Sequence, residues 1–132
     1  MKNRFLSLVL LALTISVWSC SSEKKSIDSQ VVFEAVALDI DTAFIQGDTL
    51  FTRVSYSGGC GDHTFAIEPN GPMLKSLPPK QPMRIVHRSD GDPCRAMIIE
   101  ELKYDISEYR GTPRGTTFIL LENWKPTLSY SY

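Results

Sequence analysis

The chain has 132 residues, with 14 lysines and arginines against 15 aspartates and glutamates and a formal net charge of −1. This length suits one domain built around a single hydrophobic core. The charge balance excludes the basic face that nucleic-acid-binding proteins need, so we expect no nucleic acid among the partners.

The N-terminus has the pattern of a secretory signal. Lys2 and Arg4 give it a basic start, and a mostly apolar run over residues 5–18 follows. That run is too short to cross a bilayer core of about 30 Å, which takes ~20 residues as a helix. We therefore assign residues 1–19 to a signal peptide and leave them out of the fold.

The end of this segment, "SVWSC" at residues 16–20, resembles the lipobox of bacterial lipoproteins. The resemblance implies that Cys20 is the lipidation site and carries acyl chains such as palmitate, which hold the protein at a membrane surface. Trp18 departs from the small residue usual at its position. Ser21 is not a residue that retains lipoproteins at the inner membrane. The resemblance therefore implies an outer membrane lipoprotein of a gram-negative bacterium, facing the periplasm or the cell exterior.

The remaining chain divides into a polar tether and a β-rich part. Residues 20–30 have no apolar period and predict a flexible spacer. Residues 49–56 show a strand most clearly, because Leu50, Val54 and Tyr56 share one face and polar residues alternate with them. The predicted strands cover residues 31–38, 42–46, 49–56, 63–68, 82–88, 96–106 and 116–121.

These short strands predict an all-β fold, a small antiparallel β-sandwich or barrel of about seven strands, over residues 31–132. The proline-rich stretch 70–82 is expected to be a loop that does not pair in a sheet. Good helix formers in 100–109 leave a short helix as the competing prediction there. The aromatic C-terminus, residues 121–132, is either a last strand or an exposed contact patch.

Two clusters hold both histidines and the two cysteines other than Cys20. The first is Cys60-x2-His63, and the second is "HRSDGDPC", from His87 to Cys94. Strand parity places both imidazoles on the interior side and both cysteines in turns. Together the clusters resemble a pattern of small bacterial lipoproteins, Ser-Gly-Gly-Cys, His-x-Phe and His-x3-Gly-Asp-x-Cys. The resemblance spans about forty residues and implies one joint feature, without an activity.

A disulfide between Cys60 and Cys94 is the first of three interpretations. An exported protein folds in an oxidising compartment, where two lone cysteines usually pair. Such a bond would close a loop of about 35 residues and restrict the unfolded chain by roughly 3–4 kcal/mol. The histidines would then be semi-buried polar side chains, and no cofactor is expected.

A metal site is the second interpretation. Two thiolates and two imidazoles from Cys60, His63, His87 and Cys94 suit tetrahedral zinc, and the same set with fewer thiolates suits copper. This alternative requires both thiols to stay reduced outside the cytoplasm.

A thiol nucleophile is the third interpretation, with Cys60 activated by His63 and the imidazole oriented by Asp62 or Asp90. The turn "SDGDP" at residues 89–93 lacks the rest of a calcium loop, so a calcium site is not expected. Protease, glycosidase and nucleotide-binding motifs are also missing from the sequence. We expect a lipid-anchored, non-catalytic binding or structural module of the cell envelope with an envelope protein as partner.

Overall fold

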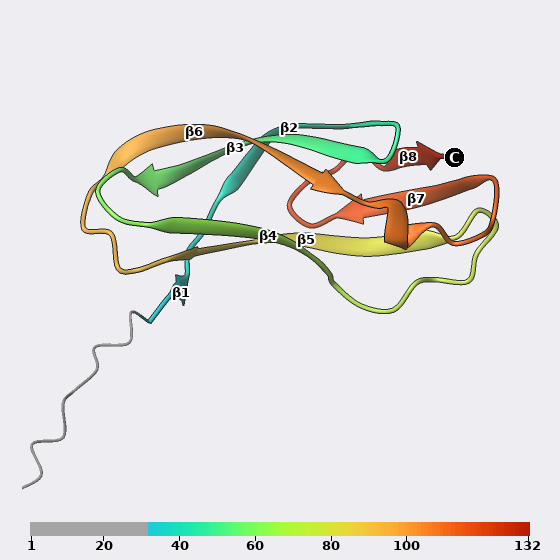
Figure 1. Ribbon diagram of the computed structural model, residues 1–132, viewed down its shortest axis with the longest axis horizontal. Coiled ribbons are helices and arrows are strands. Elements are labelled where there is room, and N and C mark those ends of the chain that lie inside the picture. Colours follow the sequence, from blue (N-terminus) through green and yellow to red (C-terminus); the bar gives the residue numbers. More distant parts are fainter. Residues whose placement is uncertain (1–31) are drawn as a thin grey trace, which may run out of the picture. The chain divides into compact units, whose positions relative to one another are not determined.

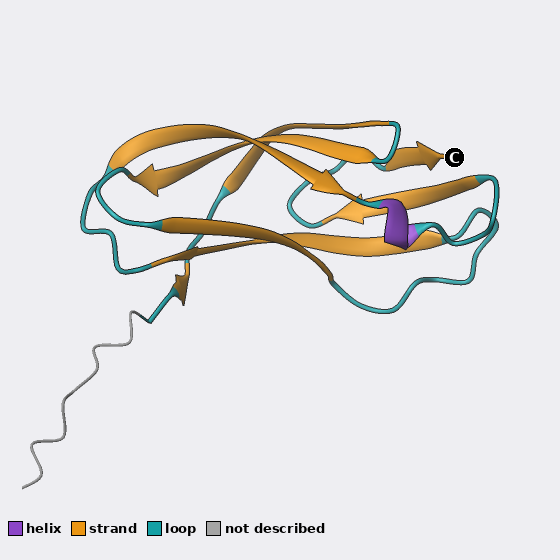
Figure 2. Cartoon of the chain, in the orientation of Figure 1, coloured by secondary structure: helices purple, strands orange, loops and turns teal. Residues whose placement is uncertain are grey.

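The computed structural model describes residues 32–132, so the predicted signal peptide, Cys20 and the tether lie outside the described residues. The regular secondary structure of this part is β-strand, apart from one short 3-10 helix (Figures 1 and 2). Its elements are β1 (Glu34–Ala35), β2 (Asp39–Gln46), β3 (Thr49–Gly58), β4 (His63–Pro69), β5 (Lys80–Ser89), β6 (Ala96–Asp105), the short 3-10 helix η1 (Ser107–Tyr109), β7 (Thr116–Leu121) and β8 (Leu128–Ser131).

Two stacked sheets form a β-sandwich, which confirms the predicted fold class (Figure 1). One sheet has three antiparallel strands in the order β2-β3-β6. In the other, β5 pairs with β4 along one edge and with β1 and β7 along the opposite edge, and β8 pairs with β7. The sheets stay open at their edge strands and do not close into a barrel.

One strand pair departs from the antiparallel pattern. Residues 80–83 of β5 run parallel to residues 118–121 of β7. The strand between them in sequence, β6, belongs to the other sheet, so the chain crosses the sandwich twice before it returns as β7. Such a crossover delivers the second strand in the same direction as the first, whereas a tight hairpin would reverse it.

Several boundaries differ from those the sequence predicts. The strand expected at 31–38 is only the two-residue β1, and β2 begins at Asp39 rather than at residue 42. The stretch 70–82 is not wholly a loop, because β5 begins at Lys80 and includes Pro82. Proline lacks an amide donor, but the carbonyl of Pro82 accepts a hydrogen bond from the amide of Asn70 at 2.9 Å. Residues 100–105 stay in β6, and helical structure is confined to η1.

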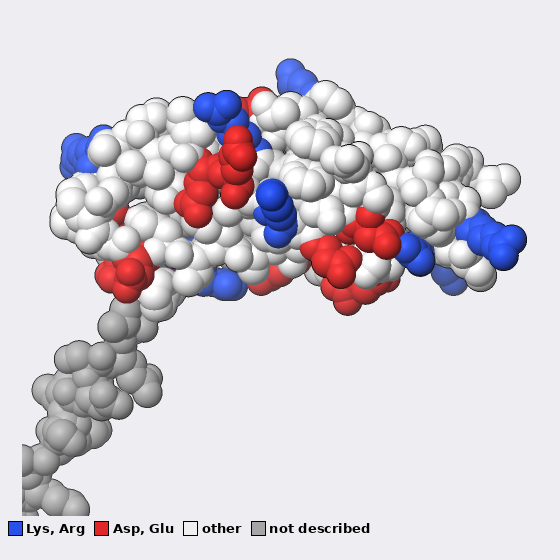
Figure 3. Space-filling view, turned by 45° about the horizontal axis from the view of Figure 1, so that its top comes forward, with Lys and Arg blue, Asp and Glu red and all other residues white. Residues whose placement is uncertain are grey.

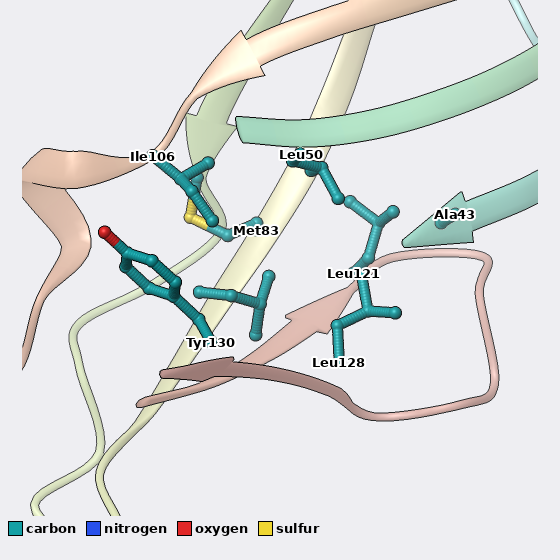
Figure 4. Close-up of a cluster of buried hydrophobic side chains, with 8 residues drawn as sticks. Ala43, Leu50, Met83, Ile106, Leu121, Leu128 and Tyr130 are labelled. Atoms are coloured by element: carbon teal, nitrogen blue, oxygen red, sulfur yellow. The ribbon is translucent and has the colours of Figure 1, made fainter. Parts of the chain in front are cut away.

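Alternation along the strands builds the core. In β3, Leu50 and Val54 are fully buried, as their two-residue period predicts. Apolar side chains from both sheets meet between the sheets (Figure 4). The buried cluster consists of Ala43, Leu50, Met83, Ile106, Ile119, Leu121, Leu128 and Tyr130.

The C-terminal residues form a strand packed on this core. Tyr130 in β8 is fully buried, and its hydroxyl donates to the carboxylate of Asp48 in the β2–β3 turn. Arg110 donates to both carboxylate oxygens of Asp48, at 2.6 and 2.7 Å, and to the Tyr130 hydroxyl at 2.9 Å. These hydrogen bonds join three distant segments at the end of the sandwich where β2 turns into β3.

Charged side chains of both signs intermingle on the face drawn in Figure 3. On the β4–β5 pair, Arg84 and Arg88 both lie within 4 Å of Glu68. No helix within residues 32–132 is long and apolar enough to span a bilayer.

Candidate functional site

The two cysteine–histidine clusters come together at one end of the sandwich. The turn after β3 carries Cys60, and the loop after β5 carries Cys94; both connections lie at the left of Figure 1. Pairing of β4 with β5 sets Phe65 opposite His87 and His63 opposite Ser89. Residues far apart in sequence therefore form one feature.

Cys60 and Cys94 form a disulfide, which confirms the first interpretation of the sequence. Their Cα atoms lie 5.7 Å apart, near the middle of the range that a disulfide spans. The bond ties the β3–β4 turn to the β5–β6 loop across a sequence separation of 34. It thereby links the two sheets at this end, since β3 and β6 belong to one sheet and β4 and β5 to the other.

Asp92 is the central acceptor of the site. One oxygen, Oδ2, accepts from the backbone amides of Gly59 at 2.6 Å and Cys60 at 3.0 Å, and Oδ1 accepts from the amide of Cys94 at 2.7 Å. Only 3% of its side chain is exposed. The Cys60 amide, the His63 ring and the remaining amides hold the pKa of Asp92 far below its usual range, and burial opposes them only in part.

His63 bridges Asp92 and His87. Its Nε2 lies 2.9 Å from Oδ2 of Asp92, and its Nδ1 lies 2.8 Å from Nε2 of His87. An ionised carboxylate only accepts hydrogen bonds, so Nε2 of His63 carries a proton and donates it. Both imidazoles face the interior, as strand parity predicts, with 9% of the His63 side chain and 2% of His87 exposed.

His87 is the innermost member of this chain of hydrogen bonds. Its Nδ1 has no well-aligned hydrogen-bond partner among residues 32–132. Burial lowers the pKa of His87 because it disfavours the charged ring, and the neighbouring charge of His63 acts in the same direction. The backbone of Ala37 opposes this shift without cancelling it. His87 is therefore held in its neutral form more strongly than an exposed histidine.

Two aromatic rings enclose the imidazoles. Phe65 stacks on His87 with ring centroids 4.6 Å apart and an angle of 11° between the planes. Tyr56 lies against both rings, 4.5 Å from His87 and 4.8 Å from His63. Its hydroxyl donates to Glu100 at 3.1 Å, and burial raises the pKa of Tyr56. Tyr56 was not among the predicted site residues, although the alternation of β3 places it on the buried face.

Glycines let the backbone approach these side chains. A Cβ on Gly58 would lie 2.8 Å from Oδ2 of Asp92 and 2.9 Å from Nε2 of His63, closer than carbon and these atoms can pack. Gly59 has a φ of 121°, a conformation that side-chain-bearing residues rarely adopt. The glycine-rich sequence of this turn therefore serves close packing on the Asp92–His63 pair.

The site in this form holds no free thiol. Cys60 is bonded to Cys94, so it is not available as the nucleophile of the third interpretation. Asp62 and Asp90 do not orient His63. Instead, Oδ1 of Asp90 accepts from the amide of Asp62 at 3.1 Å and joins the two connections. Of the four residues of the metal interpretation, Cys60 and Cys94 form the disulfide and His63 and His87 form a hydrogen-bonded pair.

A small cavity of about 100 Å³ adjoins the site, lined by β1 on one side and by His63, Ser57 and Asp92 on the other.

No family model matches the chain, and comparisons with curated proteins and with solved structures gave no match. The function of the chain is therefore inferred from the chemistry of the site.

Proposed function

We propose that this chain is a lipid-anchored lipoprotein of the cell envelope whose β-sandwich acts as a non-catalytic binding or structural module. The Cys60–Cys94 disulfide is the observation that carries the proposal. Disulfides persist in exported proteins and are rare in cytosolic ones, where thiols are kept reduced. The bond thus points to export independently of the lipobox at residues 16–20.

The polar groups of the site form hydrogen bonds with one another and with the backbone, which supports a structural role. The carboxylate of Asp92 accepts hydrogen bonds from three backbone amides and one imidazole. Both ring nitrogens of His63 are already in hydrogen bonds, and the sulfur of Cys60 is in a disulfide. General acid, general base and nucleophile roles all require a group that can reach a substrate. These groups instead hold two loops together.

Lipid attachment at Cys20 is the proposed mode of anchoring. Each buried methylene contributes about 0.8 kcal/mol, and a stable anchor takes more than one chain, which a lipoprotein cysteine carries. The tether that follows Cys20 would keep the sandwich close to the membrane. We place the protein at the outer membrane, with an envelope protein as its partner.

Metabolic labelling tests the anchor. Expression of the full chain in a gram-negative host fed an alkyne analogue of palmitate should give a labelled protein that sediments with outer membranes. Cys20→Ser should abolish the label and keep the longer, uncleaved chain. Cys60→Ser, which removes a different cysteine, is the matched control and should keep the label. Equal labelling of wild type and Cys20→Ser, or recovery of unlabelled wild type, would contradict lipidation at this position.

A further inference from the structure

Opening the disulfide would give two thiols beside a buried carboxylate, with the His63 imidazole next to that carboxylate. The Sγ atoms of Cys60 and Cys94 and a carboxylate oxygen of Asp92 lie within 4.8 Å of one another. Nε2 of His63 lies 2.9 Å from Oδ2 of Asp92. Two thiolates, one carboxylate oxygen and one imidazole nitrogen are ligands that Zn²⁺ takes in tetrahedral sites.

The backbone at the disulfide suits two thiolates on one ion. Zinc–sulfur bonds of about 2.3 Å at tetrahedral angles place two sulfurs roughly 3.8 Å apart. The Cα atoms of Cys60 and Cys94, 5.7 Å apart, allow this sulfur separation after rotation of the two side chains. Because both cysteines lie in connections between strands, this rotation leaves the sheets unchanged.

The other two ligands are already oriented by their surroundings. Asp92 is fixed by backbone amides of both connections, and its side chain is almost completely buried. Nδ1 of His63 faces Nε2 of His87 at 2.8 Å, which is the arrangement of a metal-ligating histidine whose second nitrogen donates to an outer group. Gly58 packs its backbone closely against Oδ2 of Asp92 and Nε2 of His63, which helps to fix the two groups in place.

We propose that the dithiol form of this chain binds one Zn²⁺ through Cys60, Cys94, Asp92 and His63. A disulfide oxidant, which takes two electrons from the thiolates and two protons from solvent and becomes a dithiol, forms the Cys60–Cys94 bond again and releases the ion. Asp92 replaces His87 in the ligand set that the sequence suggested, because Nε2 of His87 is engaged by His63. Opening the S–S bond takes two electrons and two protons from a dithiol reductant, which becomes a disulfide. Zinc binding then displaces the two thiol protons.

A cobalt titration tests this site. The full chain carrying Cys20→Ser has Cys60 and Cys94 as its only cysteines, and a phosphine reduces their bond while becoming a phosphine oxide. We expect the reduced chain to bind one equivalent of Co²⁺ with the visible bands of tetrahedral coordination and a thiolate-to-metal charge-transfer band, and Zn²⁺ to bleach both. The oxidised chain should show neither band. Absence of these bands after reduction would overturn the proposal.

Two variants test the ligands that are not cysteines. His63→Gln and Asp92→Asn should each weaken Zn²⁺ binding at least tenfold in competition with a chromophoric chelator and change the cobalt spectrum. Asp90→Asn makes the same substitution in the same loop and should change neither. Unaltered affinity and spectrum in His63→Gln and Asp92→Asn would overturn the four-residue site and leave the two thiols as its only ligands.

If reduction unfolds the chain, circular dichroism with and without Zn²⁺ tests the site through refolding. Binding of an ion only to the folded dithiol form must stabilise that form, so stoichiometric Zn²⁺ should restore the β-sheet spectrum and raise the melting temperature. A reduced chain that stays unfolded with Zn²⁺ would count against the site.

Discussion

The imidazoles of His63 and His87 face each other with 2.8 Å between Nδ1 of the first and Nε2 of the second. Two ring nitrogens at this distance share one proton, because two N–H groups pointing at each other repel. The outer nitrogen of His63 already donates to Asp92. One hydrogen therefore lies between the facing nitrogens and another between His63 and Asp92, and the buried Nδ1 of His87 lies at the inner end of the pair.

Burial of His87 predicts a loss of stability below neutral pH, because burial lowers the pKa of its ring. The folded-state pKa of His87 is lowered, so the unfolded chain takes up more protons as the pH falls through the ordinary histidine pKa of about 6.5. The free energy of unfolding should consequently decrease between about pH 7 and pH 5. His87→Phe, which keeps a ring against Phe65, should flatten this dependence in urea titrations. An equally steep dependence in His87→Phe would assign it to other groups.

The lowered pKa of Asp92 predicts a second loss of stability, at lower pH. Its folded-state pKa is depressed by the Cys60 amide and its other donors, so its stabilising effect is present above the ordinary aspartate pKa of about 3.9 and is lost as the pH falls below it. Asp92→Asn should be less stable at neutral pH and lose less stability between pH 5 and pH 2.5.

Asp48 and Asp105 also have lowered pKa values and remain in the Asp92→Asn variant, so some acid sensitivity should persist. Asp48→Asn is the matched control, because its carboxylate lies in the β2–β3 turn away from the disulfide. Identical pH profiles for wild type and Asp92→Asn would show that the Asp92 carboxylate does not stabilise the folded state.

Removal of the disulfide should strongly destabilise the sandwich. Loop-closure entropy for a separation of 34 residues corresponds to about 3–4 kcal/mol. The double variant Cys60→Ala, Cys94→Ala should lose this amount in urea unfolding, and its melting temperature should fall by more than about 10 °C. Addition of a reductant should lower the melting temperature of the wild type and leave the double variant unchanged. A loss below about 1 kcal/mol would mean that the unfolded chain is already compact near these residues.

Gly58→Ala should disturb the site by steric contact alone. The new Cβ would lie 2.8 and 2.9 Å from atoms of Asp92 and His63 that are held on several sides, so the cost should be roughly 1–3 kcal/mol. Ser57→Ala, at the exposed neighbouring position, should change stability by less than about 0.5 kcal/mol. Urea unfolding measures both, and histidine NMR signals should shift only in Gly58→Ala. Equal stability of the two variants would show that the turn can move aside.

The fold class and most strands could be predicted from periodicity, because side chains along β3 and β5 alternate between core and solvent. The disulfide could be predicted from the number of cysteines together with the predicted signal peptide. Parity along β4 and β5 also placed the two imidazoles inside. Each of these features could be predicted because it depends on the local residue pattern or on the compartment in which the chain is expected to fold.

The role of Asp92 could not be predicted in the same way. Its partners are backbone amides of a turn 32 and 33 residues earlier in the chain, and backbone amides leave no trace in residue type. The sequence prediction named Asp62 or Asp90 as the partner of His63, and only the folded loops show that Asp92 is its partner. The parallel pairing of β5 with β7 was also hidden, since alternation does not encode strand direction.

The parallel pairing of β5 with β7 affects the order in which the strands of the sandwich can form. β5 bonds to β4 next to it in sequence, to β1 before it and to β7 after it, so one strand collects partners from the whole described chain. Its N-terminal half lacks its parallel neighbour until residues 118–121 have emerged. During synthesis from the N-terminus, β5 therefore stays incompletely paired until β7 has been made. Late, cooperative folding governed by long-range contacts is the behaviour expected of such a topology.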